Sequence, residues 1–176
     1  YFSKFIQVSD ASNKGFTETT ISALFTWHLI VAIIAQLPVA RLMKRLSHSV
    51  ALTISALLWA IGFICIWLSG VLSSYSIAWA ALALSLFALA IVSYTPSASA
   101  LVSEIAPLDK RGIYFSINSL CWAAGYLIGP PLGGLALDQS QFVINSFWLT
   151  LAASVILTIT ILRYLHRLLL VKRNSD

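Results

Sequence analysis

The chain has 176 residues, of which 59% are hydrophobic and only 10% are charged, and its formal net charge is +5. A soluble domain carries roughly 25% charged residues, so this composition excludes a water-soluble globular protein. We predict an all-α, polytopic membrane helical bundle.

Five apolar runs are each long enough to cross a bilayer as a helix, which takes about 20 residues. In chain order they cover residues 21–39, 50–68, 77–102, 113–137 and 142–162. The links between the runs are short, so neighbouring spans must run antiparallel. Residues 1–176 are therefore predicted to form a single transmembrane domain, with no room for a separate soluble one.

The ends of the chain and its cysteines give three further expectations. Position 1 is Tyr and the only methionine is Met43, so we expect a fragment or a processed product. No charged segment followed by a short apolar one opens the chain, so no signal peptide is expected. Cys65 and Cys121 both lie in apolar runs and are predicted to be small buried side chains, without a disulfide or a metal site.

The basic residues are distributed unequally between the two ends of the predicted helices. Two of them, Lys4 and Lys14, precede the first span. The other nine fall on the opposite side: Arg41, Lys44, Arg45, Lys110, Arg111, Arg163, Arg167, Lys172 and Arg173. Because Lys and Arg favour cytoplasmic links, we predict an outside N-terminus and a cytoplasmic C-terminus. The same dispersal argues against a nucleic-acid partner.

Three tryptophans lie near the outer ends of their spans. These are Trp67, Trp79 and Trp148. Indole rings gather at the headgroup level of a bilayer, so the three positions are typical of an aromatic belt, although lipid-facing filler explains each of them equally well.

Residues 125–134 read GYLIGPPLGG and form the most unusual stretch of the chain. Gly125, Gly129 and Gly133 recur every four residues and give the fourth span a smooth stripe, against which another helix can pack closely. Pro130 and the proline after it remove backbone donors and predict a bend. The stretch suits either a moving part or a static packing kink.

The same stretch carries a resemblance to a known family. The pattern G-x-x-x-G-P-x-x-G-G, here Gly125, Gly129, Pro130, Gly133 and Gly134, resembles the signature helix motif of the major facilitator superfamily. Residues 96–134 as a whole resemble the tenth-to-eleventh helix region of bacterial drug-efflux-type facilitators. The matching features are a small-residue run, an acidic residue, a proline, an Arg-Gly pair and an aromatic: Ser97 to Ala100, Glu104, Pro107, Arg111, Gly112 and Tyr114.

The link after the first span resembles the cytoplasmic loop pattern of the same family, G-x-x-x-D-R-x-G-R-R. Its basic positions are matched by Arg41, Lys44 and Arg45. Gln36, Ala40 and Met43 replace the Gly, Asp and Gly of the pattern, a degeneration typical of the copy in the second half of these proteins. Without the aspartate, this loop lacks the group that would latch a conformation.

The resemblance implies the C-terminal half of a twelve-helix transporter in a bacterial inner membrane, with an N-terminal half as the structural alternative. Residues 1–7 would end helix seven, and the five spans would be helices eight to twelve. The implied partners are the lipid bilayer, a small-molecule substrate and the missing N-terminal half-bundle. No cofactor or metal is expected.

In that architecture the first, third and fourth spans border a central cavity, where polar side chains are candidate substrate contacts because they are costly in a membrane. The candidates are His28, Tyr94, Ser97, Asn118, Trp122 and Tyr126. Each has a structural alternative. His28 is also consistent with a neutral ring bonded to a neighbouring helix, and the others with close helix packing.

No Asp or Glu lies in the middle of a span, so a proton-coupling carboxylate is expected in the other half, with His28 as the only local alternative. Glu104 is expected to pair with Arg111 or Lys110.

No enzyme motif is present. The predicted function is secondary active transport of a small organic solute by alternating access, in the form of ion-coupled drug or metabolite efflux. The alternative is a non-transporting scaffold or assembly subunit that packs through its glycine stripe.

Overall fold

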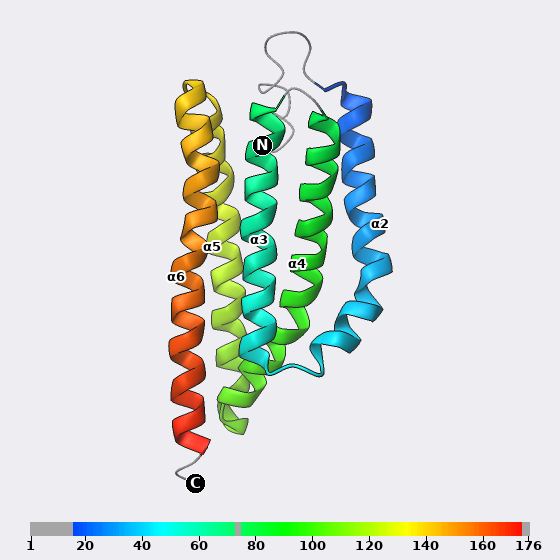
Figure 1. Ribbon diagram of the computed structural model, residues 1–176. Helices are drawn as coiled ribbons and strands as arrows, with labels where there is room; N and C mark the ends of the chain where they lie inside the picture. The colour runs from blue at the N-terminus through cyan, green and yellow to red at the C-terminus, as the bar shows by residue number, and fades with distance from the viewer. Residues whose placement is uncertain (1–15, 73–74, 174–176) are drawn as a thin grey trace.

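A computed structural model describes residues 16–72 and 75–173. The elements in chain order are α2 (Glu18–Met43), α3 (His48–Val71), α4 (Ser76–Ile105), the 3-10 turn η1 (Leu108–Lys110), α5 (Arg111–Leu137) and α6 (Gln141–Arg173). The five long helices run up and down side by side (Figure 1), and each is long and apolar enough to cross a membrane. The predicted all-α bundle is confirmed, and each predicted span falls inside one helix. The segment expected to end helix seven, residues 1–7, lies outside the described residues.

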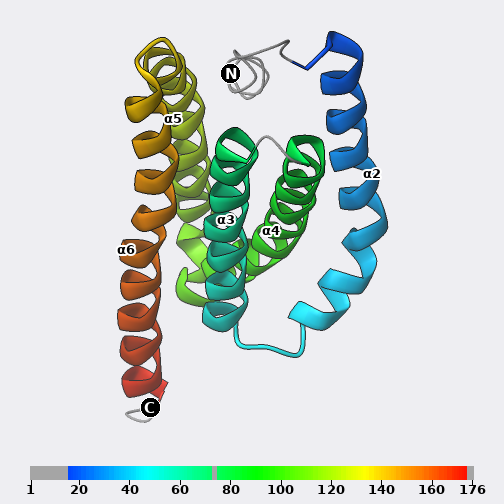
Figure 2. The same cartoon turned by 45° about the horizontal axis from the view of Figure 1, so that its top comes forward.

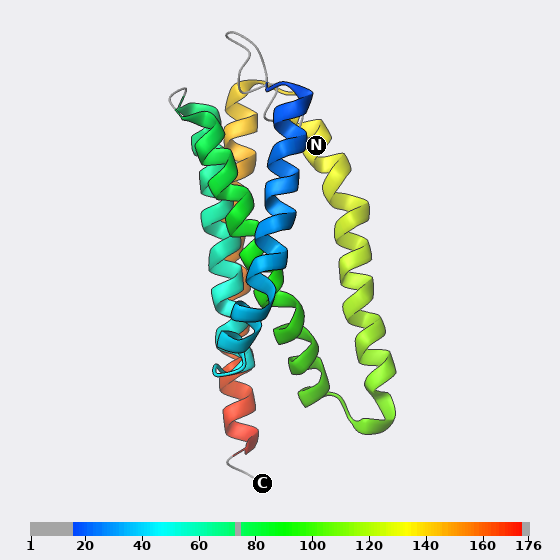
Figure 3. The same cartoon turned by 90° about the vertical axis from the view of Figure 1, so that its right-hand side faces the viewer.

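Three helices, α2, α4 and α5, contain interior prolines, and α2 and α4 bend in the half that carries the proline. α2 runs through Pro38, and its lower end turns toward α3 (Figure 2). α4 runs through Pro96, and its second half swings toward the start of α5 (Figure 3). A proline cannot donate to the carbonyl four residues earlier, which opens the helix at that point. The prolines of α5 do not end it either, since the helix continues to Leu137.

The helices pack very unequally. α4 is held between α3 and α2, and α6 lies along the other side of α3. α5 contacts α4 and α6 only sparsely and stands apart from the block (Figure 3). Most of its residues are exposed along its whole length. The molecule therefore consists of a packed block, α2–α3–α4–α6, and one helix with open faces.

The main core lies in the half of the block farther from the basic links. Small residues of α4, such as Ala80 and Ala83, are fully buried there, and large rings fill the space that they leave. The Phe87 ring lies 4.9 Å from Trp59 and 5.3 Å from Phe63, between ring centroids. A Cβ at Gly62 would lie 2.7 Å from Cδ1 of Phe87, so this glycine is what lets α3 approach the ring.

The three outer tryptophans belong to this core. Trp148 is buried within it, and Trp67 and Trp79 pack against it. The sequence placed them correctly at the end opposite the basic links. The alternative of lipid-facing filler does not hold for Trp148, which is buried because the small residues of α4 leave room for indole rings between the helices. An aromatic belt at the headgroup level stays a prediction.

The basic residues of the described helices and links share one end of the bundle, because α2, α4 and α6 end where α3 and α5 begin (Figure 1). The predicted ion pair of Glu104 with Arg111 or Lys110 is wrong. Its carboxylate faces the His48 ring at 3.8 Å, while Arg111 donates to the Ser103 carbonyl at 3.2 Å. The start of α3 lies beside the end of α4, so His48 reaches Glu104, a contact between helices that the link sequence alone does not reveal.

The two cysteines differ in environment. Cys65 is buried in the main core, as predicted. Cys121 is exposed on α5, so the prediction for it is wrong. Both lie in apolar runs, but only Cys65 sits on a helix that the block encloses.

Candidate functional site

A cavity of about 420 Å³ lies between α3, α4, α5 and α6, and we call it the inner cavity. Trp59 and Phe63 of α3 form one wall, and Tyr94 of α4 and Asn118 of α5 face it from the other side. Thr158 of α6 adds a hydroxyl. The remaining lining is apolar except for Ser55. A largely apolar hollow with a few placed polar groups is the usual form of a small-molecule site.

The polar groups of the inner cavity differ in how they are satisfied. Ser55 donates to the Ala90 carbonyl at 2.8 Å, and Thr158 donates within its own helix to Ser154. Within the described part of the chain, neither the Asn118 amide nor the Tyr94 hydroxyl hydrogen-bonds to another protein group. An amide at membrane depth is costly without a partner, so Asn118 needs water, a solute or another chain.

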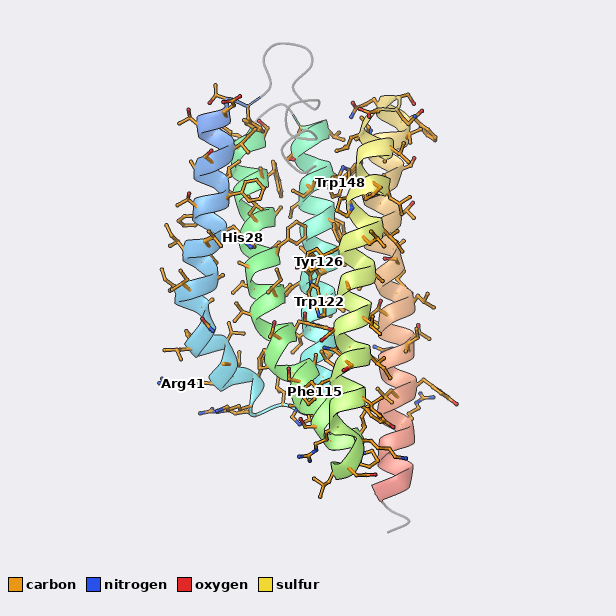
Figure 4. All side chains as sticks on the ribbon, turned by 180° about the vertical axis from the view of Figure 1, so that it is seen from behind. His28, Arg41, Phe115, Trp122, Tyr126 and Trp148 are labelled. Carbon is orange, nitrogen blue, oxygen red and sulfur yellow. The ribbon has the colours of Figure 1, made fainter. Side chains whose placement is uncertain are left out.

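A second hollow of about 320 Å³ opens beside the first, and we call it the aromatic cleft. Its lining is Tyr94, Cys121, Trp122, Gly125 and Tyr126. The Tyr94 and Trp122 rings meet edge to face at 5.5 Å, and the Trp122 and Tyr126 rings stack at 5.8 Å. Figure 4 shows Trp122 and Tyr126 on the side of α5 that faces α4. Tyr94 lines both hollows and therefore joins them.

The family model of the Major Facilitator Superfamily matches residues 5–175. The chain belongs to the major facilitator superfamily. Members of this superfamily are membrane transporters, so the chain is an integral membrane protein of a transporter family. Neither the curated proteins nor the solved structures contain a match to the chain.

Three of the candidate substrate contacts in this facilitator lie close together on α5, but they line two different hollows. Spacing of four residues puts Asn118, Trp122 and Tyr126 near one face of α5. The structure assigns Asn118 to the inner cavity and the two aromatic residues to the cleft. Tyr94 from α4 completes both, so four of the six candidates come together.

The other two candidates lie elsewhere. His28 lines neither hollow, and its Nδ1 lies 2.8 Å from the Leu84 carbonyl of α4 (Figure 4). A carbonyl only accepts, so Nδ1 must carry a proton, and this geometry favours the structural alternative. Ser97 lines neither hollow; it is buried, and its hydroxyl donates to the Ser93 carbonyl at 2.8 Å.

The glycine stripe is partly empty. A Cβ at Gly125 or Gly129 would meet nothing within 4 Å, whereas Gly133 is buried. Within the described residues, no helix therefore presses against the first two positions, and the close packing expected there is not found inside this chain.

The contributions of α3 and α6 to the inner cavity were not predicted from the sequence. The family architecture directed attention to the first, third and fourth spans. A signal was nevertheless present, because Ser55, Trp59 and Phe63 recur every four residues and so share one face of α3. Val155 and Thr158 of α6 form a similar short series.

Proposed function

We propose that this chain is the C-terminal half of a twelve-helix secondary transporter that moves a small amphipathic organic solute by alternating access. The observation that carries the proposal is the unsatisfied side-chain amide of Asn118. Its amide faces a largely apolar cavity inside the span and has no partner in the described protein. A solute with one hydrogen-bonding group would satisfy the amide.

The two hollows suggest the chemistry of the solute. The inner cavity offers Trp59 and Phe63, and the cleft offers the stacked Trp122 and Tyr126. Flat or apolar bodies bind well against such rings. No charged side chain lines either hollow in the described residues, so this half favours an uncharged aromatic body, and any charge on the solute would be matched by the other half.

The open face of α5 is the proposed place where the two halves meet. Gly125 and Gly129 present backbone without a neighbour within 4 Å, and small residues are where membrane helices approach closely. A half-bundle seated there would close the open side of the cleft and could rock against α5. Extending the reading frame upstream of residue 1 tests this, since the proposal requires seven further spans.

Ion-coupled efflux is the proposed form of transport. No Asp or Glu lies in the middle of a span, and the geometry of His28 favours a bond to α4 over a role in proton transfer. The coupling carboxylate is therefore assigned to the other half. The resemblance of residues 96–134 to drug-efflux-type facilitators supports the outward direction.

The test uses everted vesicles that contain the full-length protein and are energised with a proton gradient. The probes are Nile red, an uncharged aromatic dye, and ethidium, a cationic one. We expect Nile red to accumulate, and Trp122→Ala to slow its accumulation because the ring stack is lost. Leu127→Ala is the matched control, because Leu127 is exposed about half a turn away on α5.

Two outcomes would count against the proposal. Unchanged Nile red accumulation in Trp122→Ala, or an equal loss in Leu127→Ala, would remove the cleft from the transport path. Absence of gradient-driven movement of both dyes would contradict efflux of an amphipathic aromatic solute.

A further inference from the structure

A third hollow lies apart from both candidate sites, at the basic end of the bundle between α3 and α6. It measures about 420 Å³, and we call it the α3–α6 groove. Its lining is Ser49, Val50, Thr53, Ile54, Leu162, Arg163 and Arg167. α6 packs along α3 (Figure 1), and the lining residues belong to the first turns of α3 and the second half of α6.

The groove combines an apolar wall with two positive charges. Val50, Ile54 and Leu162 supply the wall. Arg163 and Arg167 are one turn apart on α6, so both guanidinium groups border the same groove, where like charges at this spacing repel. Both are exposed.

No negative group in the described chain relieves this repulsion. The lining contains no Asp or Glu, and no ion pair joins either arginine to a carboxylate of the described residues. The Thr53 hydroxyl is already used, since it donates to the Ser49 carbonyl at 2.8 Å. The groove therefore has an excess of positive charge that an anion would complement.

The depth of the groove identifies the kind of anion. The apolar run that crosses the membrane in α6 covers residues 142–162. Arg163 directly follows this run and Arg167 lies one turn beyond it, which is the level of lipid headgroups. The apolar wall extends from this level into the membrane. An acyl chain can pack against this wall, whereas a small water-soluble anion gains nothing from it.

We propose that the α3–α6 groove binds an anionic phospholipid of the leaflet at the basic end. The lipid phosphate lies between the guanidinium groups of Arg163 and Arg167, which match phosphate geometry with paired N–H donors. One acyl chain lies along Val50, Ile54 and Leu162. The lipid neutralises the arginine pair and fills the seam between α3 and α6.

The experiment measures the thermal unfolding midpoint of the full-length protein in phosphatidylcholine-containing micelles as dioleoylphosphatidylglycerol is added. A lipid that binds only the folded state raises the midpoint. We expect such a rise for the natural sequence. Because each basic residue contributes to binding of anionic lipid, Arg163→Gln with Arg167→Gln should need roughly 30-fold more phosphatidylglycerol for the same rise.

The matched control is Arg41→Gln with Lys44→Gln. It removes the same charge from the same end of the bundle, and Arg41 lies on the side of the bundle away from α6 (Figure 4). We expect this variant to keep the phosphatidylglycerol response. A second variant, Ile54→Trp, fills the apolar wall and leaves both arginines in place, and we expect it to lose the response as the arginine variant does.

Several results would overturn the proposal. They are no rise with phosphatidylglycerol in the natural sequence, an equal loss in the Arg41 control, or a full response in Ile54→Trp. An equal rise produced by inorganic phosphate alone would show that the arginines bind a free anion and not a lipid. If the double arginine variant does not fold, the Ile54→Trp result decides.

Discussion

The packed block and α5 have similar apolar sequences but opposite surroundings. In the block, α4 is fixed by side-chain bonds from both neighbours. Trp27 Nε1 donates to Ser85 Oγ, and Ser55 Oγ donates to the Ala90 carbonyl, each at 2.8 Å. Among the described residues, the side-chain hydrogen bond that joins α5 to another long helix is that of Arg111, which donates to the Ser103 carbonyl near the end of α4.

This difference shows that a membrane helix can be apolar without being packed in the protein core. Hydrophobicity alone takes a helix into lipid, and packing then depends on shape and on a few polar contacts. The block has small residues facing large rings, as at Gly62 and Phe87. α5 has small residues facing open space, as at Gly125. We therefore expect substitutions in the block to act on stability and those on the cavity side of α5 to act on transport.

The largest effect on stability is expected from Phe87→Ala. This ring is nearly buried between Trp59 and Phe63, and removing a buried phenyl ring costs about 3 kcal/mol or more. Unfolding of the purified full-length protein in mixed micelles measures the loss. Phe142→Ala is the control, because Phe142 is 80% exposed at the start of α6. Equal losses in the two variants would mean that the block is not the rigid part.

A smaller effect is expected from Gly62→Ala. The added methyl group would collide with the Phe87 ring, which two other rings hold in place, and overpacking of this kind costs about 1–3 kcal/mol. Gly112→Ala is the control, because nothing lies within 4 Å of a Cβ there. The same unfolding assay applies, and a loss at Gly112 as large as that at Gly62 would contradict the packing described.

The smallest effect is expected from His28→Ala. It removes one bond between α2 and α4, and such bonds in membranes are worth about 0.6 kcal/mol on average. The control is Thr26→Ala, whose hydroxyl bonds only to the Ser22 carbonyl of its own helix. The stability of both variants is measured alongside gradient-driven Nile red movement. Abolished transport with unchanged stability would instead support His28 as the proton-coupling group.

The arrangement of spans was predictable because it follows from local properties. Length, hydropathy and the placement of Lys and Arg act along the chain, so the five helices and their shared basic end appear in the sequence itself. The spacing of Asn118, Trp122 and Tyr126 likewise predicted a common face of α5, and the rings of Trp122 and Tyr126 do stack.

The remaining features depend on which helices become neighbours. Cys65 and Cys121 have similar local sequence, and only the position of α5 outside the block makes Cys121 exposed. Glu104 meets His48 because two helix ends lie together, although Arg111 is closer in the chain. Asn118 lines one hollow, and Trp122 and Tyr126 line the other. Tyr94 of α4 lies between them, and its position cannot be predicted from the sequence of α5 alone.

The most direct test of the account is the water accessibility of position 118. The full-length protein, carrying Cys121→Ser and Asn118→Cys, is reconstituted in vesicles and treated from each side with a charged, membrane-impermeant maleimide. Leu127→Cys in the same background is the control, since Leu127 is exposed on α5 about half a turn away from Asn118. The account predicts that Asn118→Cys is labelled, that Nile red slows this labelling, and that Leu127→Cys stays unlabelled in the lipid. A lack of labelling at position 118 from both sides, or equal labelling at the two positions, would contradict it and would favour a packing surface without transport.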